Sequence, residues 1–250
     1  MNTAFLFFAN TVLLARLFVL FKDDAVAGRP WLIKTIVEVT VLVFFYRLSP
    51  GWFGTAGVAL AANLAGWRWE TKARRRKNLG RLLLGLFELA GMSFFFTPGS
   101  SMSFHPRFDL AGWIMEDFTA LAPLVRLAAS PSFQLKFAGL LMAGNEANLA
   151  IRAVFDLLDL KPRALPAGQG VIDMGEFNRG RVIGVLERVL LYWFIMAGQL
   201  SAIGFVLAAK AFTRFKALDD RPFAEYVLIG TLLSACLALT AAGLIRSVLG

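Results

Sequence analysis

Long apolar runs alternate with short polar segments along the chain. Six of these runs have about the length that an α-helix needs to cross the hydrocarbon core of a membrane, roughly 20 residues. They lie at residues 3–21, 31–46, 52–67, 82–96, 182–209 and 223–244. Helices satisfy their own backbone hydrogen bonds in lipid, so the pattern predicts an all-α, polytopic transmembrane helical bundle of about six spans. We expect residues 1–250 to form a single membrane domain.

Two details of this pattern bear on the spans themselves. The second and third runs are separated only by Arg47-Leu48-Ser49-Pro50-Gly51, a sequence typical of a tight reversal, which predicts a helical hairpin. The fifth run is longer than the hydrocarbon core requires. We therefore expect this span to tilt or to project into the cytoplasm.

The long segment 98–180 has ordinary polar content, and we expect it to be extramembrane or interfacial. It holds one or two amphipathic or re-entrant helices, at residues 109–126 and 133–160. The second of these carries Gly144, Asn145, Glu146 and Asn148 at its centre. Either Asn145 caps a helix that begins at Glu146, or the polar groups Asn145, Glu146 and Asn148 face a cavity at membrane depth, as in transporters with broken helices.

Composition supports a membrane class. Of the 250 residues, 58% are hydrophobic and 17% are charged, below the roughly 25% charged of soluble domains. The mean hydropathy is +0.64 and the net charge is +9. The basic residues cluster in short segments between apolar runs, which favours anionic lipid headgroups as partners and argues against nucleic acid.

The distribution of lysine and arginine predicts the orientation. Three short loops hold 13 of these residues, whereas segment 98–180 holds 7. The positive-inside rule therefore places the short loops in the cytoplasm and both termini outside it, in a bacterial inner membrane. Tryptophans at the ends of the spans are typical of an interfacial aromatic belt.

Ionisable groups inside spans are costly, so each is a candidate pathway or ligand-binding residue. Glu38 and Glu88 are the best intramembrane carboxylates. Lys34 precedes Glu38 by four residues, a spacing that permits an ion pair, and Arg16 is an alternative partner for either carboxylate. A structural pair and a role in proton or cation handling both remain open.

The fifth run carries three more polar candidates, Glu187, Arg188 and Gln199. On one continuous helix these groups follow one side, which would face the interior of the bundle. The alternative is that Glu187 and Arg188 pair locally at the level of the headgroups. Gln199 would lie deeper in the membrane.

Small residues recur every four positions in the last run, at Gly230, Ser234, Ala238 and Ala242. This spacing lets helices approach closely and predicts a helix or subunit interface in a homo-oligomer. We expect the lone Cys236 to be buried and inert.

Enzyme chemistry has little support in the sequence. The single histidine, His105, is followed by a proline in a predicted loop, and no motif for a nucleotide, a metal or a catalytic triad was found. We predict neither a cofactor nor a metal site. A carboxylate-based enzyme acting on lipid is the remaining enzymatic alternative.

The last quarter of the chain carries a series of polar positions in an apolar setting, in Gly180-Arg181-Val182-Ile183-Gly184-Val185-Leu186-Glu187-Arg188, Gly198-Gln199, Lys210, Arg214-Phe215 and Ala224-Glu225-Tyr226. It resembles the C-terminal region of uncharacterised bacterial inner-membrane proteins grouped as a domain of unknown function. The resemblance implies a bacterial inner membrane and no particular activity.

Two functions follow as hypotheses. The first is an oligomeric channel or transporter for an ion or small solute, with the polar groups of the spans facing an interior path. The second is a membrane-anchored sensor or scaffold that engages a partner protein or anionic lipid through its cytoplasmic basic loops. The candidate contacts for the second function are Arg74, Arg75, Arg76, Lys77, Lys210 and Arg214.

Overall fold

The computed structural model describes residues 2–20, 22, 25–26, 28–72, 77–97, 99, 102–105, 122–160, 174–213 and 221–249. Within these ranges the secondary structure is helical apart from one isolated bridge between Tyr46 and Phe104, so the all-α prediction is confirmed. Within the predicted single domain, the structure has two compact units, Met1–Leu141 and Met142–Gly250.

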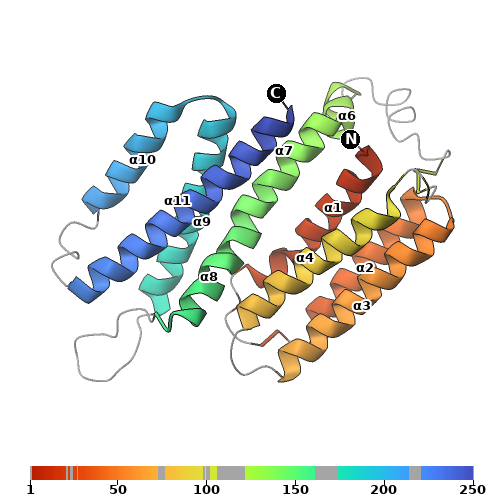
Figure 1. The fold of residues 1–250 in the computed structure, drawn as a ribbon, viewed down its shortest axis with the longest axis horizontal. Helices are drawn as coiled ribbons and strands as arrows, with labels where there is room; N and C mark the ends of the chain where they lie inside the picture. Colours follow the sequence, from red (N-terminus) through yellow and green to blue (C-terminus); the bar gives the residue numbers. More distant parts are fainter. Residues whose placement is uncertain are drawn as a thin grey trace. The chain divides into compact units, whose positions relative to one another are not determined.

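The first unit is a bundle of helices that follow one another along the chain. Its elements are α1 (Thr3–Ala15), η1 (Arg16–Val19), α2 (Gly28–Phe45), α3 (Pro50–Lys72), α4 (Lys77–Phe95), α6 (Ala122–Ala129) and α7 (Pro131–Leu141). Helix α3 packs against both α2 and α4, and α1 packs against α2 and α7 (Figure 1). The first four apolar runs are therefore helices, with bounds close to those expected from hydropathy.

The predicted hairpin of α2 and α3 is present, and its turn follows from two residues. The side chain of Ser49 accepts a hydrogen bond of 3.2 Å from the amide of Trp52, as an N-cap residue does. Pro50 occupies the first position of α3, where its missing N–H costs nothing. The polar reversal seen in the sequence thus starts the third helix.

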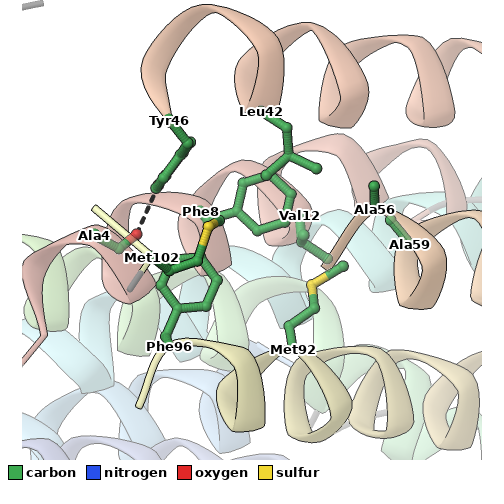
Figure 2. Packing of buried hydrophobic residues seen from close by; sticks show 10 residues of the cluster. All are labelled: Ala4, Phe8, Val12, Leu42, Tyr46, Ala56, Ala59, Met92, Phe96 and Met102. Atoms are coloured by element: carbon green, nitrogen blue, oxygen red, sulfur yellow. Dashed lines mark hydrogen bonds between the residues drawn. The ribbon is translucent and has the colours of Figure 1, made fainter. Parts of the chain in front are cut away.

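An aromatic core joins the ends of α1, α2 and α4. The ring of Tyr46 lies 5.9 Å from that of Phe8 and 5.8 Å from that of Phe96, both in edge-to-face arrangement. Its hydroxyl donates a hydrogen bond of 2.7 Å to the carbonyl of Ala4 (Figure 2). Because Tyr46 is fully buried, this bond satisfies its one polar atom.

The second unit contains η3 (Met142–Glu146), α8 (Ala147–Leu157), α9 (Met174–Met196), α10 (Leu200–Thr213) and α11 (Arg221–Leu249). Helix α9 packs against α11 and against α10 (Figure 1). The last apolar run is α11. The expected single helix over 182–209 is wrong, because α9 ends at Met196 and α10 begins at Leu200.

Gly198 explains this break. Its φ of 74° lies in the left-handed region, which favours glycine. The amide of Gly198 donates to the carbonyl of Ile195 at 3.0 Å, and the amide of Gln199 donates to that of Phe194 at 2.8 Å. These two bonds form a Schellman motif, which ends α9. Arg246 adds a bond of 3.2 Å from Nη1 to the carbonyl of Ile195, at the negative end of the helix.

The polar centre of the segment 133–160 does not break its helix. Helical backbone continues from α7 through η3 into α8, and η3 is a single widened turn of π-helix. The expectation that Asn145 caps a helix starting at Glu146 is wrong, since Asn145 lies inside the continuous helical run and no side-chain cap bond precedes α8. Of the amphipathic helix expected at 109–126, residues 109–121 lie outside the described ranges.

By length and composition, one helix within the described ranges could cross a membrane, at Ala224–Leu249. Two shorter apolar helices occur at Thr3–Val19 and Leu200–Phe212. Taken alone, one such helix is weak evidence for a membrane protein.

Candidate functional site

The centre of the first unit holds a buried polar cluster contributed by three helices. Lys34 and Glu38 come from α2, Asn63 from α3 and Glu88 from α4. Each of the four residues is at most 3% exposed. We call this group the Lys34 cluster.

Lys34 is the hub of this cluster. Its Nζ donates hydrogen bonds to Oδ1 of Asn63 at 2.7 Å and to Oε1 of Glu88 at 2.5 Å. The same Nζ atom lies 2.5 Å from Oε1 of Glu38, one helical turn further along α2. One ammonium group therefore contacts two carboxylates and an amide.

The two oxygens of Glu38 have different surroundings. Its Oε2 accepts a hydrogen bond of 2.6 Å from Nδ2 of Asn63. Its Oε1 atom is buried and, despite its short distance to Lys34, receives no hydrogen bond of acceptable geometry from the described residues. Burial removes this oxygen from water, and it meets Lys34 as an ion pair without an aligned hydrogen bond.

Three of the four residues of the Lys34 cluster could be predicted from the sequence, and the fourth could not. Glu38, Glu88 and the spacing of Lys34 are all visible in the chain, and the structure brings these three residues together. Asn63 was missed because it stands alone in a Gly/Ala-rich run. The available signal was a single amide side chain among the apolar residues of a predicted span, which indicates a buried polar contact.

Arg16, expected as an alternative partner of the carboxylates, makes a different described contact. Its Nη2 donates a hydrogen bond of 2.9 Å to the main-chain carbonyl of Arg81. Its guanidinium lies over Gly85, where an added Cβ would approach Cζ of Arg16 to 2.4 Å. Gly85 therefore leaves the space that this buried side chain occupies.

A second buried pair lies in the same unit, between Glu70 of α3 and Arg81 of α4. Nε of Arg81 is 2.5 Å from Oε1 of Glu70, and Nη2 is 3.0 Å from Oε2, so the contact is bidentate. Val26 donates its amide to the same carboxylate at 3.0 Å. The sequence pattern does not indicate this pair, because it predicts a basic cytoplasmic loop between the runs at 52–67 and 82–96.

The second unit is organised around a buried arginine. Arg188 of α9 donates from Nε to the carbonyl of Ala143 at 2.9 Å and from Nη2 to the carbonyl of Gly144 at 3.3 Å. It also donates to Oδ1 of Asn148 and to Oγ of Ser234 at 3.2–3.3 Å. A widened turn displaces carbonyls from their usual amide partners, and the guanidinium supplies donors to two of them.

The remaining candidates of the fifth run separate from one another. Glu187 pairs with Lys210, which joins α9 to α10. Gln199 lies in the exposed turn between these helices and not deep in a span. The single-helix stripe of polar groups is therefore wrong, because the Gly198 turn folds its second half back.

Other predicted residues take up packing positions. Gly230 of α11 faces the ring of Phe155, to which an added Cβ would come within 3.1 Å. Ala238 and Ala242 are fully buried, and Asn145 donates a hydrogen bond of 3.0 Å to Glu146.

Cys236 is exposed, contrary to expectation. Of the basic-loop candidates, Lys77 is partly buried, while Arg74, Arg75, Arg76 and Arg214 lie outside the described ranges.

The chemistry open to these groups is proton and charge handling. No group of three or more histidine, cysteine or acidic side chains that could hold a metal occurs in the part of the chain that the structure describes. The Lys34 cluster and Arg188 lie within their helices. The pair of Glu70 and Arg81 joins the end of α3 to the beginning of α4. Comparison of the chain with protein-family models, curated proteins and solved structures found no match.

Proposed function

We propose that the chain is an α-helical integral membrane protein of a bacterial inner membrane. The observation that carries this proposal is the burial of charged side chains within helices whose exposed faces carry many large apolar side chains. Among the described residues, seven charged ones are at most 2% exposed: Arg16, Lys34, Glu38, Glu70, Arg81, Glu88 and Arg188. In water-soluble proteins such residues are almost never fully buried unless they are paired.

The outer surface supports the same proposal. Many large apolar side chains are each more than a third exposed. They occur along the whole length of their helices. On α2 and α4 they include Leu32, Ile33, Ile36, Phe44, Leu83, Phe87 and Phe94. Large exposed apolar surfaces mark contacts with membranes or with other proteins. A surrounding lipid bilayer would cover such surfaces on every side of the helices.

The buried pairs also explain why α2 resembles a span only weakly by composition. It carries Arg29, Lys34 and Glu38 within its 18 residues. Lys34 and Glu38 lie against each other in the interior, so they would not face hydrocarbon. A count of charges along the sequence cannot make this distinction.

We propose eight crossings in place of six. The continuous helix of α7, η3 and α8 has segments of 11, 5 and 11 residues and reaches about 40 Å, enough to cross. The break at Gly198 turns the fifth run into two crossings. Helix α10 is short, about 20 Å, which thinning of the bilayer accommodates. The crossing by α7, η3 and α8 and the extra crossing by α10 each reverse the direction of the chain once. Together they leave both termini outside the cytoplasm, as six crossings would.

The basic loops support this topology. With eight crossings, the loops after α1, α3, α8 and α10 share one side and contain most of the basic loop residues, among them Lys22, Arg74, Arg75, Arg76, Lys161, Arg163, Arg214 and Lys216. The turn between α9 and α10 contains none. This asymmetry supports a cytoplasmic position for the four basic loops.

For its role we propose a membrane-anchored scaffold or sensor that engages anionic lipid through these loops. Glu38 and Glu88, the leading candidates for a transport path, are buried in contacts with Lys34 and Asn63. Gln199, the third candidate, lies in a turn. The test is native mass spectrometry of the protein extracted from phosphatidylglycerol-containing membranes. Changing Arg74, Arg75, Arg76 and Lys77 to glutamine should reduce the number of retained anionic lipids, and unchanged retention would exclude this loop as the contact.

Transport of an ion or small solute is the second candidate. The observation in its favour is the π-helical turn beside buried Arg188, since such turns occur frequently at functional sites. Proteoliposomes loaded with a pH-sensitive dye and placed in a potassium gradient would decide. Proton or potassium flux that is lost in Arg188→Gln would favour transport over the scaffold role.

Membrane integration itself has a direct biochemical test. Membranes that contain the chain are washed at alkaline pH in carbonate, which strips peripheral proteins. We expect the chain to remain in the pellet and to dissolve only in detergent. Release by the carbonate wash would exclude an integral protein.

A further inference from the structure

The Lys34 cluster has unequal numbers of acidic and basic groups. One ammonium, Lys34, faces two carboxylates, Glu38 and Glu88, and the only other polar member is the neutral Asn63. The pair of Glu70 and Arg81, by contrast, has one group of each sign. With all of its groups ionised, the Lys34 cluster would carry a buried negative charge.

Charged groups on neighbouring elements are few. From η1, Arg16 reaches Gly85, about one turn before Glu88, and donates to the carbonyl of Arg81. From α4 and α3, Arg81 and Glu70 are bonded to each other. The described hydrogen bonds of Lys34, Glu38 and Glu88 stay within the cluster.

One oxygen of the cluster could carry a proton without losing a hydrogen bond. Oε1 of Glu38 is buried and receives no hydrogen bond of acceptable geometry, whereas Glu88 accepts from Lys34 through its Oε1 atom. Both Oε1 atoms lie 2.5 Å from the same Nζ, so they are at most about 5 Å apart. Carboxylates that share one buried site do not both ionise readily, and their titration belongs to the pair.

We propose that Glu38 and Glu88 together hold one exchangeable proton, which makes the Lys34 cluster a proton-binding site that is neutral when occupied. Loss of the proton leaves two carboxylates on one ammonium and loosens the contact between α2 and α4. The chain then responds to pH through the packing of these helices.

This inference goes beyond the proposed function and does not depend on it, since it requires only that the cluster be buried. Infrared spectroscopy of the detergent-purified protein tests it directly, because a protonated carboxyl absorbs apart from a carboxylate. We expect a protonated-carboxyl band at neutral pH that shifts in heavy water, as an exchangeable proton requires. It should disappear on titration to alkaline pH with the amplitude of one group.

Variants assign the band. Glu38→Gln and Glu88→Gln each leave one carboxylate on Lys34, so the band should be lost in both. Glu70→Gln is the matched control, since that residue has its own arginine, and it should retain the band. No band in the unaltered protein would overturn the proposal and would indicate that Arg16 supplies the missing charge. A band that survives both cluster variants would overturn it as well, by placing the proton elsewhere.

Discussion

The Nζ atom of Lys34 lies 2.5 Å from Oε1 of Glu88, a contact that joins α2 to α4 across 54 positions of the sequence. Both side chains are buried, so neither charge has water to compensate it if the other is removed. Buried pairs of this kind add little net stability over an apolar pair, but breaking one is costly. The contact therefore fixes which faces of α2 and α4 meet.

Removing the hub of the cluster should destabilise the fold strongly. Lys34→Met leaves the carboxyl groups of Glu38 and Glu88 without their cation, and we expect a loss of about 3–5 kcal/mol in the free energy of unfolding. Unfolding in detergent, followed by circular dichroism, measures this loss. Arg29→Met is the control, because Arg29 is exposed on the same helix and its change should be nearly neutral. Equal losses in both variants would contradict a special role for the cluster.

The bidentate pair of Glu70 and Arg81 should show energetic coupling. A double-mutant cycle with Glu70→Gln and Arg81→Gln isolates their interaction, for which we expect roughly 0.5–3 kcal/mol. The parallel cycle of Glu70→Gln with Arg29→Gln serves as the reference and should be additive. Additivity in both cycles would show that the described contact carries no net interaction energy.

The parts of the fold that follow from local pattern could be predicted. Apolar runs located α1, α2, α3, α4 and α11, and the Ser49-Pro50 pair located a turn. The spacing of Lys34 and Glu38 indicated a pair because residues four apart share a helix face. These features depend on neighbours in sequence, which a single chain displays.

The remaining features depend on contacts between distant residues or on one backbone angle. Gly198 ends α9 inside an uninterrupted apolar run, so hydropathy alone could not locate the turn. The partner of Glu70 is on another helix, and its burial is invisible until α3 and α4 pack. Gly144 to Glu146 resembled a helix break because their composition is polar, whereas Arg188 allows the helix to continue through a π turn.

The turn at Gly198 should tolerate no side chain. Its positive φ makes Gly198→Ala unfavourable by about 1–2 kcal/mol, and the variant should weaken the hairpin of α9 and α10. Gly204→Ala is the matched change, since Gly204 lies inside α10 with no atom within 4 Å of an added Cβ. It should be neutral or stabilise by up to about 1 kcal/mol. Thermal unfolding of the two variants side by side checks the prediction.

Close packing of α3 against α2 provides a further test. A Cβ at Gly66 would lie 2.4 Å from the indole ring of Trp31, which is buried, so Gly66→Ala should cost about 1–3 kcal/mol. Gly57 is on the same helix and has open space, so Gly57→Ala should cost nothing. Chemical denaturation of both variants measures the difference, and an undisturbed Gly66→Ala protein would refute the close contact.

The account depends on lipid being the solvent of the exposed apolar faces, and spin-label accessibility measures this directly. Labels are attached at Ile36→Cys on α2 and Phe87→Cys on α4, both more than half exposed, with Leu48→Cys in the turn as the reference and Cys236 changed to serine. In reconstituted membranes, we predict that oxygen, which dissolves in lipid, reaches the labels at 36 and 87 while a water-soluble nickel chelate does not. The chelate should reach the label at 48. Equal access of the chelate to all three labels would contradict the membrane assignment.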